Sequence, residues 1–356
     1  MKDHPVNFHP QIDMKELTRL TRGGKLEEAM ALLTGGRAKK PLPVPAFPGK
    51  LTSLLGRLPG GRPGIGPIPM PVSVPPGAHF EEHSFSNRAG TRPYKLYVPS
   101  GYAGQPLPLV VMLHGCTQSP DDFAAGTRMN ELAEEMTFLV AYPGQPQSAN
   151  MSKCWNWYNP GDQTRNSGEP SLIAGITRGI IDEFAADPGR VYVAGLSAGG
   201  AAAAIMGAAY PDLFAAIGVH SGLACGAARD MPSAFAAMRA GGPVSGEKAA
   251  PPVPAIIFHG DRDGTVNPVN GHQVAAQSKA GAELRIVEEF GVSPGGMRFT
   301  RRIEFSASGK PVIEHWNLHG AGHAWSGGSA AGSYTDPSGP DASREMIRFF
   351  LEHHLG

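Results

Sequence analysis

The chain has 356 residues, of which 41% are apolar and 17% are charged, and its 31 acidic and 31 basic side chains give a formal net charge of zero. This length is sufficient to bury a substantial core. The balanced charge gives no global reason to expect a nucleic-acid partner, and no run approaches the roughly 18 consecutive apolar residues that a membrane span requires.

The first residues lack the apolar core and small-residue cleavage site of a secretory signal. We therefore expect a chain that stays in the cytoplasm, leaves by a different route, or has its true start upstream. Residues 1–35 predict a helical extension of two short helices, interrupted at Gly23 and Gly24. Residues 36–79 are dense in proline and glycine, which predicts a linker or a belt over a neighbouring surface. A tail without a catalytic role is the favoured interpretation of both segments.

From about residue 80 the pattern changes to short apolar runs that alternate with helical segments. A polar-faced hairpin is predicted first, and a closing helix is predicted over residues 341–354. Continuous apolar runs are typical of strands covered on both faces, so the alternation predicts an α/β fold with a mostly parallel sheet flanked by helices. The strands are expected at 108–115, 138–144, 190–197, 214–222 and 254–260, and the helices between them at 121–136, 171–187 and 199–210.

Ser197 lies in a G-x-S-x-G pattern between the third apolar run and an alanine-rich helix. A nucleophile held at a strained strand-to-helix turn needs small residues two positions before and after it, and Gly195 and Gly199 meet this need. The alternative is a glycine-serine turn with no chemistry. The strand and helix on either side favour the nucleophile, and the small side chains of the helix predict that it packs closely on the sheet.

A serine hydroxyl is a weak nucleophile at neutral pH and needs a base that is oriented by an acid. On this architecture the expected chain order is serine, acid, histidine. Asp263 follows the last apolar run on a loop and is the preferred acid. Asp261 is the competitor, but it lies nearer the strand end and is expected to stabilise the loop. The alternative for both is an aspartate that caps a turn.

His323 is the preferred base among thirteen histidines, because it follows the acid and is flanked by Gly320 and Gly322. His315 and His319 lie on the preceding strand pattern and are expected to be structural or exposed. An oxyanion needs two backbone N–H donors, and we expect Ala198 and Cys116 to supply them, with His114 and Gly115 shaping the second loop. Cys116 is less suitable as a nucleophile because no second base is evident.

The cysteines have no metal-binding spacing, so neither a metal nor any other cofactor is expected. Trp155 and Trp157 lie on a loop rich in asparagine, proline and glycine, where they either line a cleft or pack over the sheet. Trp325, two residues after the candidate base, is expected to form a cleft wall, and His114 is expected to contact the substrate.

Five segments resemble the poly(3-hydroxybutyrate) depolymerase family of esterases, which is close to feruloyl and acetylxylan esterases among the α/β-hydrolases. The segments are "LHGCTQSPDDFA" (113–124), "CWNWYNPGDQTRNSGEPSLIAGI" (154–176), "VYVAGLSAGGAA" (191–202), "IIFHGDRDGTVNP" (256–268) and "GAGHAWSGG" (320–328). The resemblance implies an α/β-hydrolase catalytic domain over residues 80–356. It also implies Ser197 as nucleophile, Asp263 as acid, His323 as base and Cys116 at the oxyanion position.

The resemblance further places Cys116 near Cys154, and a disulfide between them is a hypothesis, with Cys225 left as a free thiol. It suggests an extracellular protein, whereas the missing signal suggests a cytoplasmic one or non-standard export. No polymer-binding domain is apparent after the closing helix. Soluble short-chain hydroxyalkanoate-type esters or oligomers are therefore the expected small-molecule partners. The alternatives are a feruloyl or acetylxylan esterase, an acyltransferase, and a binding module with a vestigial serine turn.

Overall fold

The structure is a computed structural model that describes residues 73–243, 253–279 and 284–356. These residues belong to one compact unit, Gly66–Gly356. The predicted extension over residues 1–35 lies outside the described residues, as does all but the end of the predicted linker over residues 36–79. Both stay predictions. The first described strand begins at His79.

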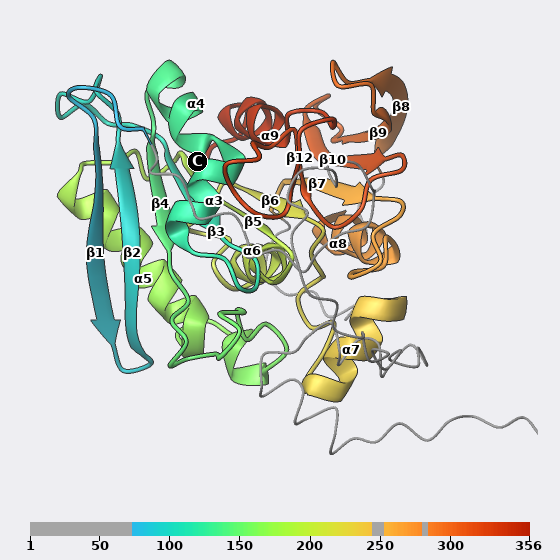
Figure 1. Cartoon of the computed structure of the whole chain (residues 1–356), viewed down its shortest axis with the longest axis horizontal. Coiled ribbons are helices and arrows are strands. Elements are labelled where there is room, and N and C mark those ends of the chain that lie inside the picture. The colour runs from blue at the N-terminus through green and yellow to red at the C-terminus, as the bar shows by residue number, and fades with distance from the viewer. Residues whose placement is uncertain (1–72, 244–252, 280–283) are drawn as a thin grey trace, which may run out of the picture. The chain divides into compact units, whose positions relative to one another are not determined.

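A ten-stranded sheet runs through the described residues in the order β1-β2-β4-β3-β5-β6-β7-β10-β9-β8 (Figure 1). The six central strands from β4 to β10 are parallel, and antiparallel pairs close both edges. This confirms the predicted α/β fold with a mostly parallel sheet. The strands are β1 His79–Asn87, β2 Gly90–Val98, β3 Leu109–Leu113, β4 Leu139–Pro143, β5 Val191–Leu196, β6 Ala216–His220, β7 Ala255–Gly260, β8 Arg285–Val292, β9 Arg298–Phe305 and β10 Pro311–Leu318.

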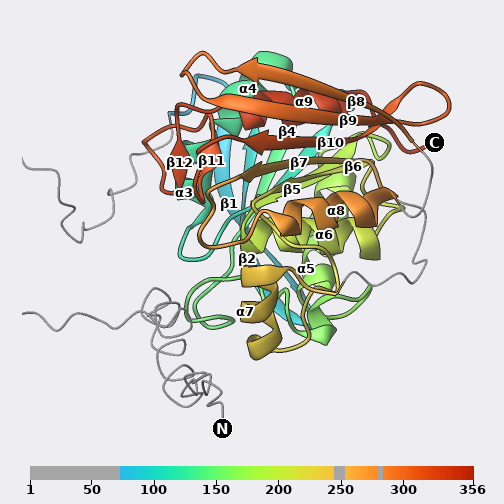
Figure 2. The same ribbon diagram turned by 90° about the vertical axis from the view of Figure 1, so that its right-hand side faces the viewer.

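Helices cover both faces of the sheet (Figure 2). One face carries α5 Gly168–Glu183, α6 Ala198–Ala209 and α8 Val269–Lys279, with α7 Met231–Ala240 packed against α8. The other carries α3 Pro120–Thr127, α4 Met129–Met136 and α9 Ala342–Leu351. A 3₁₀ turn, η1 Pro160–Asp162, and a short parallel pair, β11 Trp325–Ser326 with β12 Thr335–Asp336, complete the described elements. Within the described ranges, every helix is too short or too polar to cross a membrane.

Alternate residues of a central strand pack into two separate cores. On β3, Leu109, Val111 and Leu113 join the core under α5 and α6, whereas Val110 and Met112 join the core under α4 and α9. Successive side chains of a strand point to opposite faces, so a strand with two covered faces needs apolar residues at every position. This is why the central strands read as unbroken apolar runs in the sequence.

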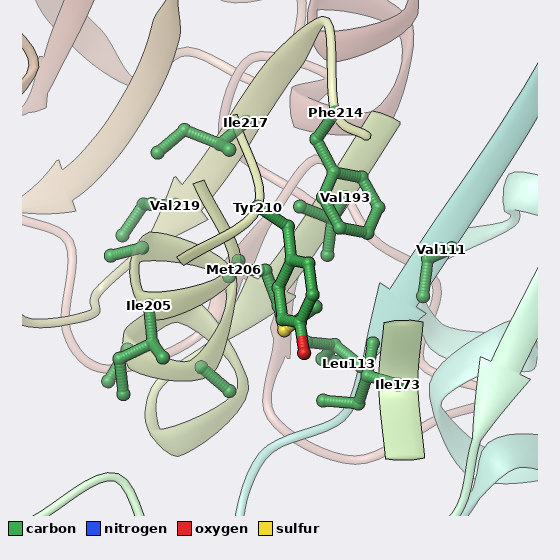
Figure 3. Close-up of a cluster of buried hydrophobic side chains, with 14 of the residues drawn as sticks. Val111, Leu113, Ile173, Val193, Ile205, Met206, Tyr210, Phe214, Ile217 and Val219 are labelled. Atoms are coloured by element: carbon green, nitrogen blue, oxygen red, sulfur yellow. The ribbon is translucent and has the colours of Figure 1, made fainter. Parts of the chain in front are cut away.

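The alanine-rich helix α6 packs directly on the sheet, as its small side chains predict. A Cβ atom on Gly207 would lie 2.9 Å from Cγ2 of Ile217 on β6, so any side chain there would push the helix away. Figure 3 shows Ile205 and Met206 of this helix in one cluster of buried side chains with Val193 of β5 and Ile217. The close approach fixes where the N-terminus of α6 lies relative to the strand ends.

Two features differ from the sequence-based expectations. The segment predicted as one helix over residues 121–136 is two helices, because Arg128 adopts a left-handed φ of 54° between α3 and α4. Strands β8 and β9 were not predicted. Most side chains of β8 are exposed, and the strand lies at the sheet edge, so it lacks the apolar pattern of the buried strands.

The buried carboxylate of Glu314 on β10 joins the last helix, α9, to the sheet. The Glu314 side chain on β10 is 0% exposed and pairs with Arg301 of β9 at 2.8 Å and with Arg348 of α9 at 2.6 Å. The indole N–H of Trp316 also donates to it at 3.3 Å. A carboxylate removed from water is stable only when such partners surround it.

Replacing Glu314 with alanine is expected to lower the free energy of unfolding by about 2 kcal/mol, because the charged hydrogen bonds of the buried carboxylate are lost. The cost stays moderate because Arg301 and Arg348 are partly exposed and keep other carboxylate partners. The matched control is Glu135→Ala, whose pair with Arg344 is half exposed on both sides and is expected to change stability by less than about 1 kcal/mol. Urea unfolding of both variants measures the difference. If both variants lost the same free energy of unfolding, the buried carboxylate of Glu314 would contribute no more to stability than the exposed one of Glu135.

Candidate active site

Ser197 occupies a strained turn between β5 and α6. Its backbone has φ 58° and ψ −118°, a region that L-residues enter only when the surroundings hold them there. The Gly195 and Gly199 backbones touch one another, and a Cβ on Gly199 would overlap the carbonyl oxygen of Leu113 on β3. The glycine spacing of the motif is therefore a steric requirement, and it leaves the Ser197 side chain partly exposed at the carboxyl edge of the sheet.

The structure brings His323 and Asp263 together. The Nδ1–H of His323 donates to Oδ2 of Asp263 at 2.7 Å. The other carboxylate oxygen, Oδ1, accepts backbone N–H bonds from Thr265 at 2.9 Å and Val266 at 2.8 Å. The Asp263 side chain is 0% exposed and that of His323 is 12% exposed. The Asp263 carboxylate is therefore fixed at Nδ1 of His323, and the other ring nitrogen, Nε2, takes no part in this bond.

The environment of Asp263 favours its charged form. Burial acts to raise the pKa of this carboxyl group, but the hydrogen bond and the attraction from His323, together with the Val266 N–H and His259, outweigh it and hold the pKa below its ordinary value. His259 approaches Oδ2 at 3.5 Å while it is bonded to the Val266 carbonyl at 2.9 Å. An acceptor that stays ionised is the kind of group that orients a histidine and stabilises its cation.

Asp261, the competing acid, has a different partner. Its carboxylate pairs with Nδ1 of His319 at 3.0 Å and accepts the Gly320 N–H at 2.7 Å. It thus ties the end of β7 to the loop after β10, in the loop-stabilising place expected for it. Of the two aspartates, Asp263 is the one in contact with His323.

His220, at the carboxyl end of β6, connects the serine turn to the histidine loop. Its carbonyl accepts the Ser197 N–H at 2.9 Å, and its ring Nε2 accepts the Ser326 N–H at 3.0 Å. The ring is 0% exposed and lies stacked against Trp325 and Phe258. The sequence analysis did not single out His220, although the rule that polar residues at strand ends gather at one edge applies to it as well.

Burial keeps this histidine neutral. Burial is the main cause that lowers the pKa of His220 to about 3, and the charges of His259 and His323 act in the same direction. A proton on Nε2 would also face the N–H of Ser326 instead of an acceptor. The neutral form with Nδ1 bonded to Ser221 Oγ at 3.2 Å satisfies both ring nitrogens.

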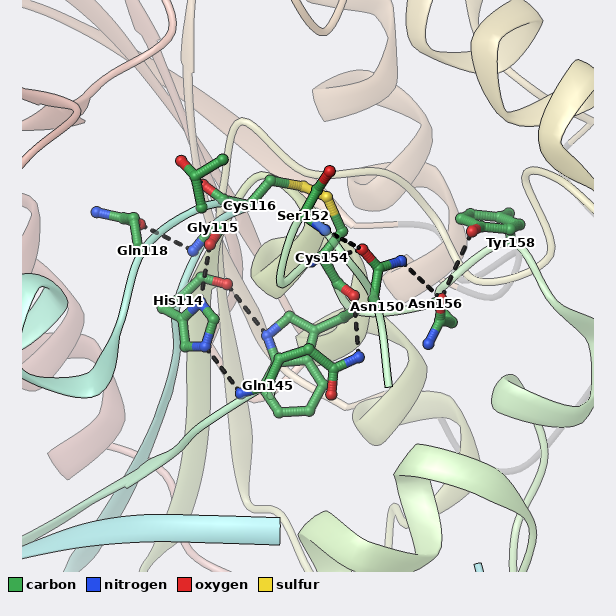
Figure 4. The surroundings of a disulfide bond; sticks show 12 residues. His114, Gly115, Cys116, Gln118, Gln145, Asn150, Ser152, Cys154, Asn156 and Tyr158 are labelled. Carbon is green, nitrogen blue, oxygen red and sulfur yellow. Dashed lines mark hydrogen bonds between the residues drawn. A yellow bond between two sulfur atoms is a disulfide. The ribbon is translucent and has the colours of Figure 1, made fainter. Parts of the chain in front are cut away.

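The loop after β3 is braced over the serine turn. Gln118 Oε1 accepts the Gly115 N–H at 2.8 Å, and the Thr117 N–H donates to the Ser152 carbonyl at 2.7 Å. The hypothesis of a disulfide between Cys116 and Cys154 is confirmed, and their Cα atoms lie 4.2 Å apart (Figure 4). These bonds use the N–H groups on either side of Cys116, whose own N–H remains the candidate oxyanion donor together with that of Ala198 at the start of α6.

The side chains expected to bind substrate lie in the protein interior. Trp155 is 0% exposed and Trp325 is 1% exposed, while Trp157 and His114 are also buried. The Trp155 indole donates to the His114 carbonyl at 3.1 Å, and that of Trp325 donates to Ser343 at 3.1 Å. His114 Nε2 accepts the Gln145 N–H at 3.0 Å. All four residues bury more than nine tenths of their surface, which differs from the substrate contacts expected for them.

No group of three or more histidine, cysteine or acidic side chains suited to a metal ion occurs within residues 73–243, 253–279 and 284–356. Cys225 is a free thiol in a mostly apolar setting, and burial raises its pKa to about 11.

Known proteins resemble the chain in sequence and fold. The family described as "Esterase PHB depolymerase" matches residues 92–285. A poly(3-hydroxyalkanoate) depolymerase C from Paucimonas lemoignei is 36% identical over 66% of this chain and 59% of its own. A feruloyl esterase B from Neurospora crassa is 39% identical over 39% of this chain and 46% of its own. The chain thus spans less than two thirds of the length of these curated relatives.

A solved structure, an acetyl xylan esterase from Aspergillus awamori, shares the fold with a TM-score of 0.59 at 21% identity, covering 77% of this chain and 99% of its own. The α/β-hydrolase architecture expected from the five sequence segments is thereby confirmed.

The neutral state of His220 predicts a loss of stability in acid. The unfolded chain binds a proton on this histidine below about pH 6.5, whereas the folded chain does so only near pH 3. The free energy of unfolding is therefore expected to fall by up to about 1.4 kcal/mol for each pH unit between these two values. His220→Gln, which keeps an acceptor for Ser326, is expected to reduce this slope. The exposed His79→Gln serves as control.

The measurement is the free energy of unfolding in urea at pH 7, 6 and 5. Equal slopes in the wild-type protein and the His220→Gln variant would show that the His220 ring takes up its proton in both states.

Proposed function

The chain belongs to the esterase PHB depolymerase family, and from that premise we propose that it is a serine carboxylic-ester hydrolase. The residues proposed to act are Ser197, Asp263 and His323. The observation that carries the proposal is the 2.7 Å bond between His323 Nδ1 and Asp263 Oδ2. The strained turn that holds Ser197 at the end of β5 supports it.

The proposed reaction forms and then hydrolyses an acyl-enzyme. His323 Nε2 accepts the proton of the Ser197 hydroxyl, and Oγ attacks the ester carbonyl carbon. Asp263 holds the imidazole with Nδ1 protonated and stabilises the cation that forms. The same proton then passes from His323 to the leaving alcohol as the ester bond breaks, and a water molecule, activated in the same way, releases the acid.

Two backbone N–H groups are proposed to receive the oxyanion. Ala198 is the first residue of α6, where the free N–H groups and the helix dipole favour negative charge. Cys116 lies on the loop that the disulfide and the Gln118 side chain hold over the serine turn. Preorganised donors of this kind contribute much of the stabilisation of a tetrahedral intermediate, because they need no reorganisation during the reaction.

The proposed substrates are short-chain hydroxyalkanoate-type esters or their oligomers. This choice is supported by the depolymerase relative, whose match covers more of this chain than that of the feruloyl esterase. The matched relatives also support a second candidate, a feruloyl or acetylxylan esterase. An acyltransferase would use the same acyl-enzyme with an alcohol in place of water.

The Ser197→Ala variant is expected to remain folded and to lose at least about 10³-fold in kcat for ester hydrolysis, because no other group forms the acyl-enzyme. The measurement covers a hydroxybutyrate trimer ester, an acetylated sugar and a feruloyl ester, with thermal unfolding as the folding control. Near wild-type turnover in the variant would refute the proposed nucleophile. The substrate with the highest kcat/KM in the wild-type protein decides between the two esterase candidates.

A further inference from the structure

Burial of the expected substrate-binding tryptophans leaves few aromatic rings available to a ligand. Among the phenylalanine, tyrosine and tryptophan side chains of the described residues, Phe290 and Tyr334 are the exposed ones, at 79% and 48%. Phe290 lies on β8, an outermost strand of the sheet, and four strands separate β8 from β5, which leads to Ser197. Adjacent strands are roughly 4.8 Å apart, so Phe290 is remote from the site.

Tyr334 lies between the two loops that carry the proposed oxyanion donor and the proposed base. Its hydroxyl is 3.4 Å from Oγ1 of Thr117, the residue that follows Cys116. Its carbonyl accepts the N–H of Trp325 at 2.7 Å, and Trp325 follows His323 by two residues. The hydroxyl end of this half-exposed ring therefore lies next to the loop that carries Cys116, and its backbone is bonded to the loop that carries His323.

The backbone of Tyr334 is strained and is held from both sides. Its φ is 52°, in the left-handed region that bulky residues rarely adopt. The preceding residue, Ser333, is bonded to the side chains of Asp122 and Gln118, and the next residue, Thr335, pairs with Trp325 in the β11–β12 ladder. Asparagine or glycine would occupy such a position at lower cost, so the backbone does not require a tyrosine here.

Thr117, whose hydroxyl faces that of Tyr334, also has a left-handed backbone. Its φ is 67° although it is β-branched, and its hydroxyl also donates to the Cys116 carbonyl at 2.6 Å. Two strained residues thus face one another through their hydroxyl groups at the edge of the proposed oxyanion loop. Strain of this kind persists only where the surrounding structure holds it, and it clusters at ligand sites.

We propose that Tyr334 is a specificity-determining residue that contacts the part of an ester substrate lying beyond the reacting carbonyl group. The ring covers an apolar segment of the substrate. The phenolic O–H exchanges its long 3.4 Å contact with Thr117 Oγ1 for a hydrogen bond to a second carbonyl. A hydroxyalkanoate oligomer offers both groups, since short apolar segments alternate with ester carbonyls along its chain. This inference rests on the proposed ester hydrolysis at Ser197.

The test compares kcat/KM for a hydroxybutyrate trimer ester with kcat/KM for a minimal acetate ester, in the full chain. Tyr334→Asn removes the ring and keeps a residue that tolerates the left-handed backbone. It is expected to lower the trimer-to-acetate ratio about tenfold, mainly through KM for the trimer. Tyr334→Phe, which loses only the hydroxyl, is expected to lower the ratio about threefold. Phe290→Asn, the control for loss of an exposed ring, is expected to leave the ratio unchanged.

Thermal unfolding separates a substrate role from a structural one. Because asparagine relieves the backbone strain, Tyr334→Asn is expected to unfold at the wild-type temperature or above it. A trimer-to-acetate ratio within twofold of wild type, or a ratio that falls only together with the unfolding temperature, would overturn the role of Tyr334. Absence of Ser197-dependent hydrolysis of both esters in the wild-type protein would instead refute the proposed function, and the role of Tyr334 with it.

Discussion

Parallel pairing between β7 and β10 places Gly260 opposite Leu318, and the loops that leave these two residues remain in backbone contact beyond the sheet. The N–H of Asp261 donates to the Leu318 carbonyl, and that of Arg262 donates to the Ala321 carbonyl, both at 3.0 Å. A Cβ on Gly260 would overlap the backbone at Ala321, so the approach requires glycine. Asp263 and His323 meet because their loops are joined in this way, although 60 residues separate them in sequence.

The serine turn is connected to the same unit through β6. His220 accepts the Ser197 N–H with its carbonyl and the Ser326 N–H with its ring, so one buried residue links the serine turn to the loop that carries His323. The loop after β3 is fixed separately, by the disulfide on one side and by Gln118 on the other. The ends of four strands, β5, β6, β7 and β10, together with two braces on the loop after β3, therefore position these groups. Preorganisation of this kind is what electrostatic stabilisation of a transition state requires.

The sequence was sufficient to predict the α/β fold, the central strands and the glycine-flanked serine turn, since unbroken apolar runs and a steric motif are local signals. The preference for Asp263 over Asp261 followed from chain order and loop length, and the partners of the two carboxylates agree with it. The positions of Trp155 and Trp325 were not predictable, because a loop rich in polar residues can still fold an indole beneath itself when a backbone carbonyl or a serine accepts its N–H. Tyr334 and His220 carry no local motif, and only the tertiary contacts reveal what they adjoin.

The proposed ester hydrolysis requires a reactive Ser197 that is activated by the pair of His323 and Asp263. The most direct measurement is the rate at which a fluorophosphonate labels the protein, followed by intact mass and by the mass of the modified peptide. We expect one label on Ser197, labelling at least about 10²-fold slower in Asp263→Asn because the imidazole loses its orienting acceptor, and near wild-type labelling in Asp261→Asn. Labelling at another residue, or equal rates in the two aspartate variants, would contradict the assignment.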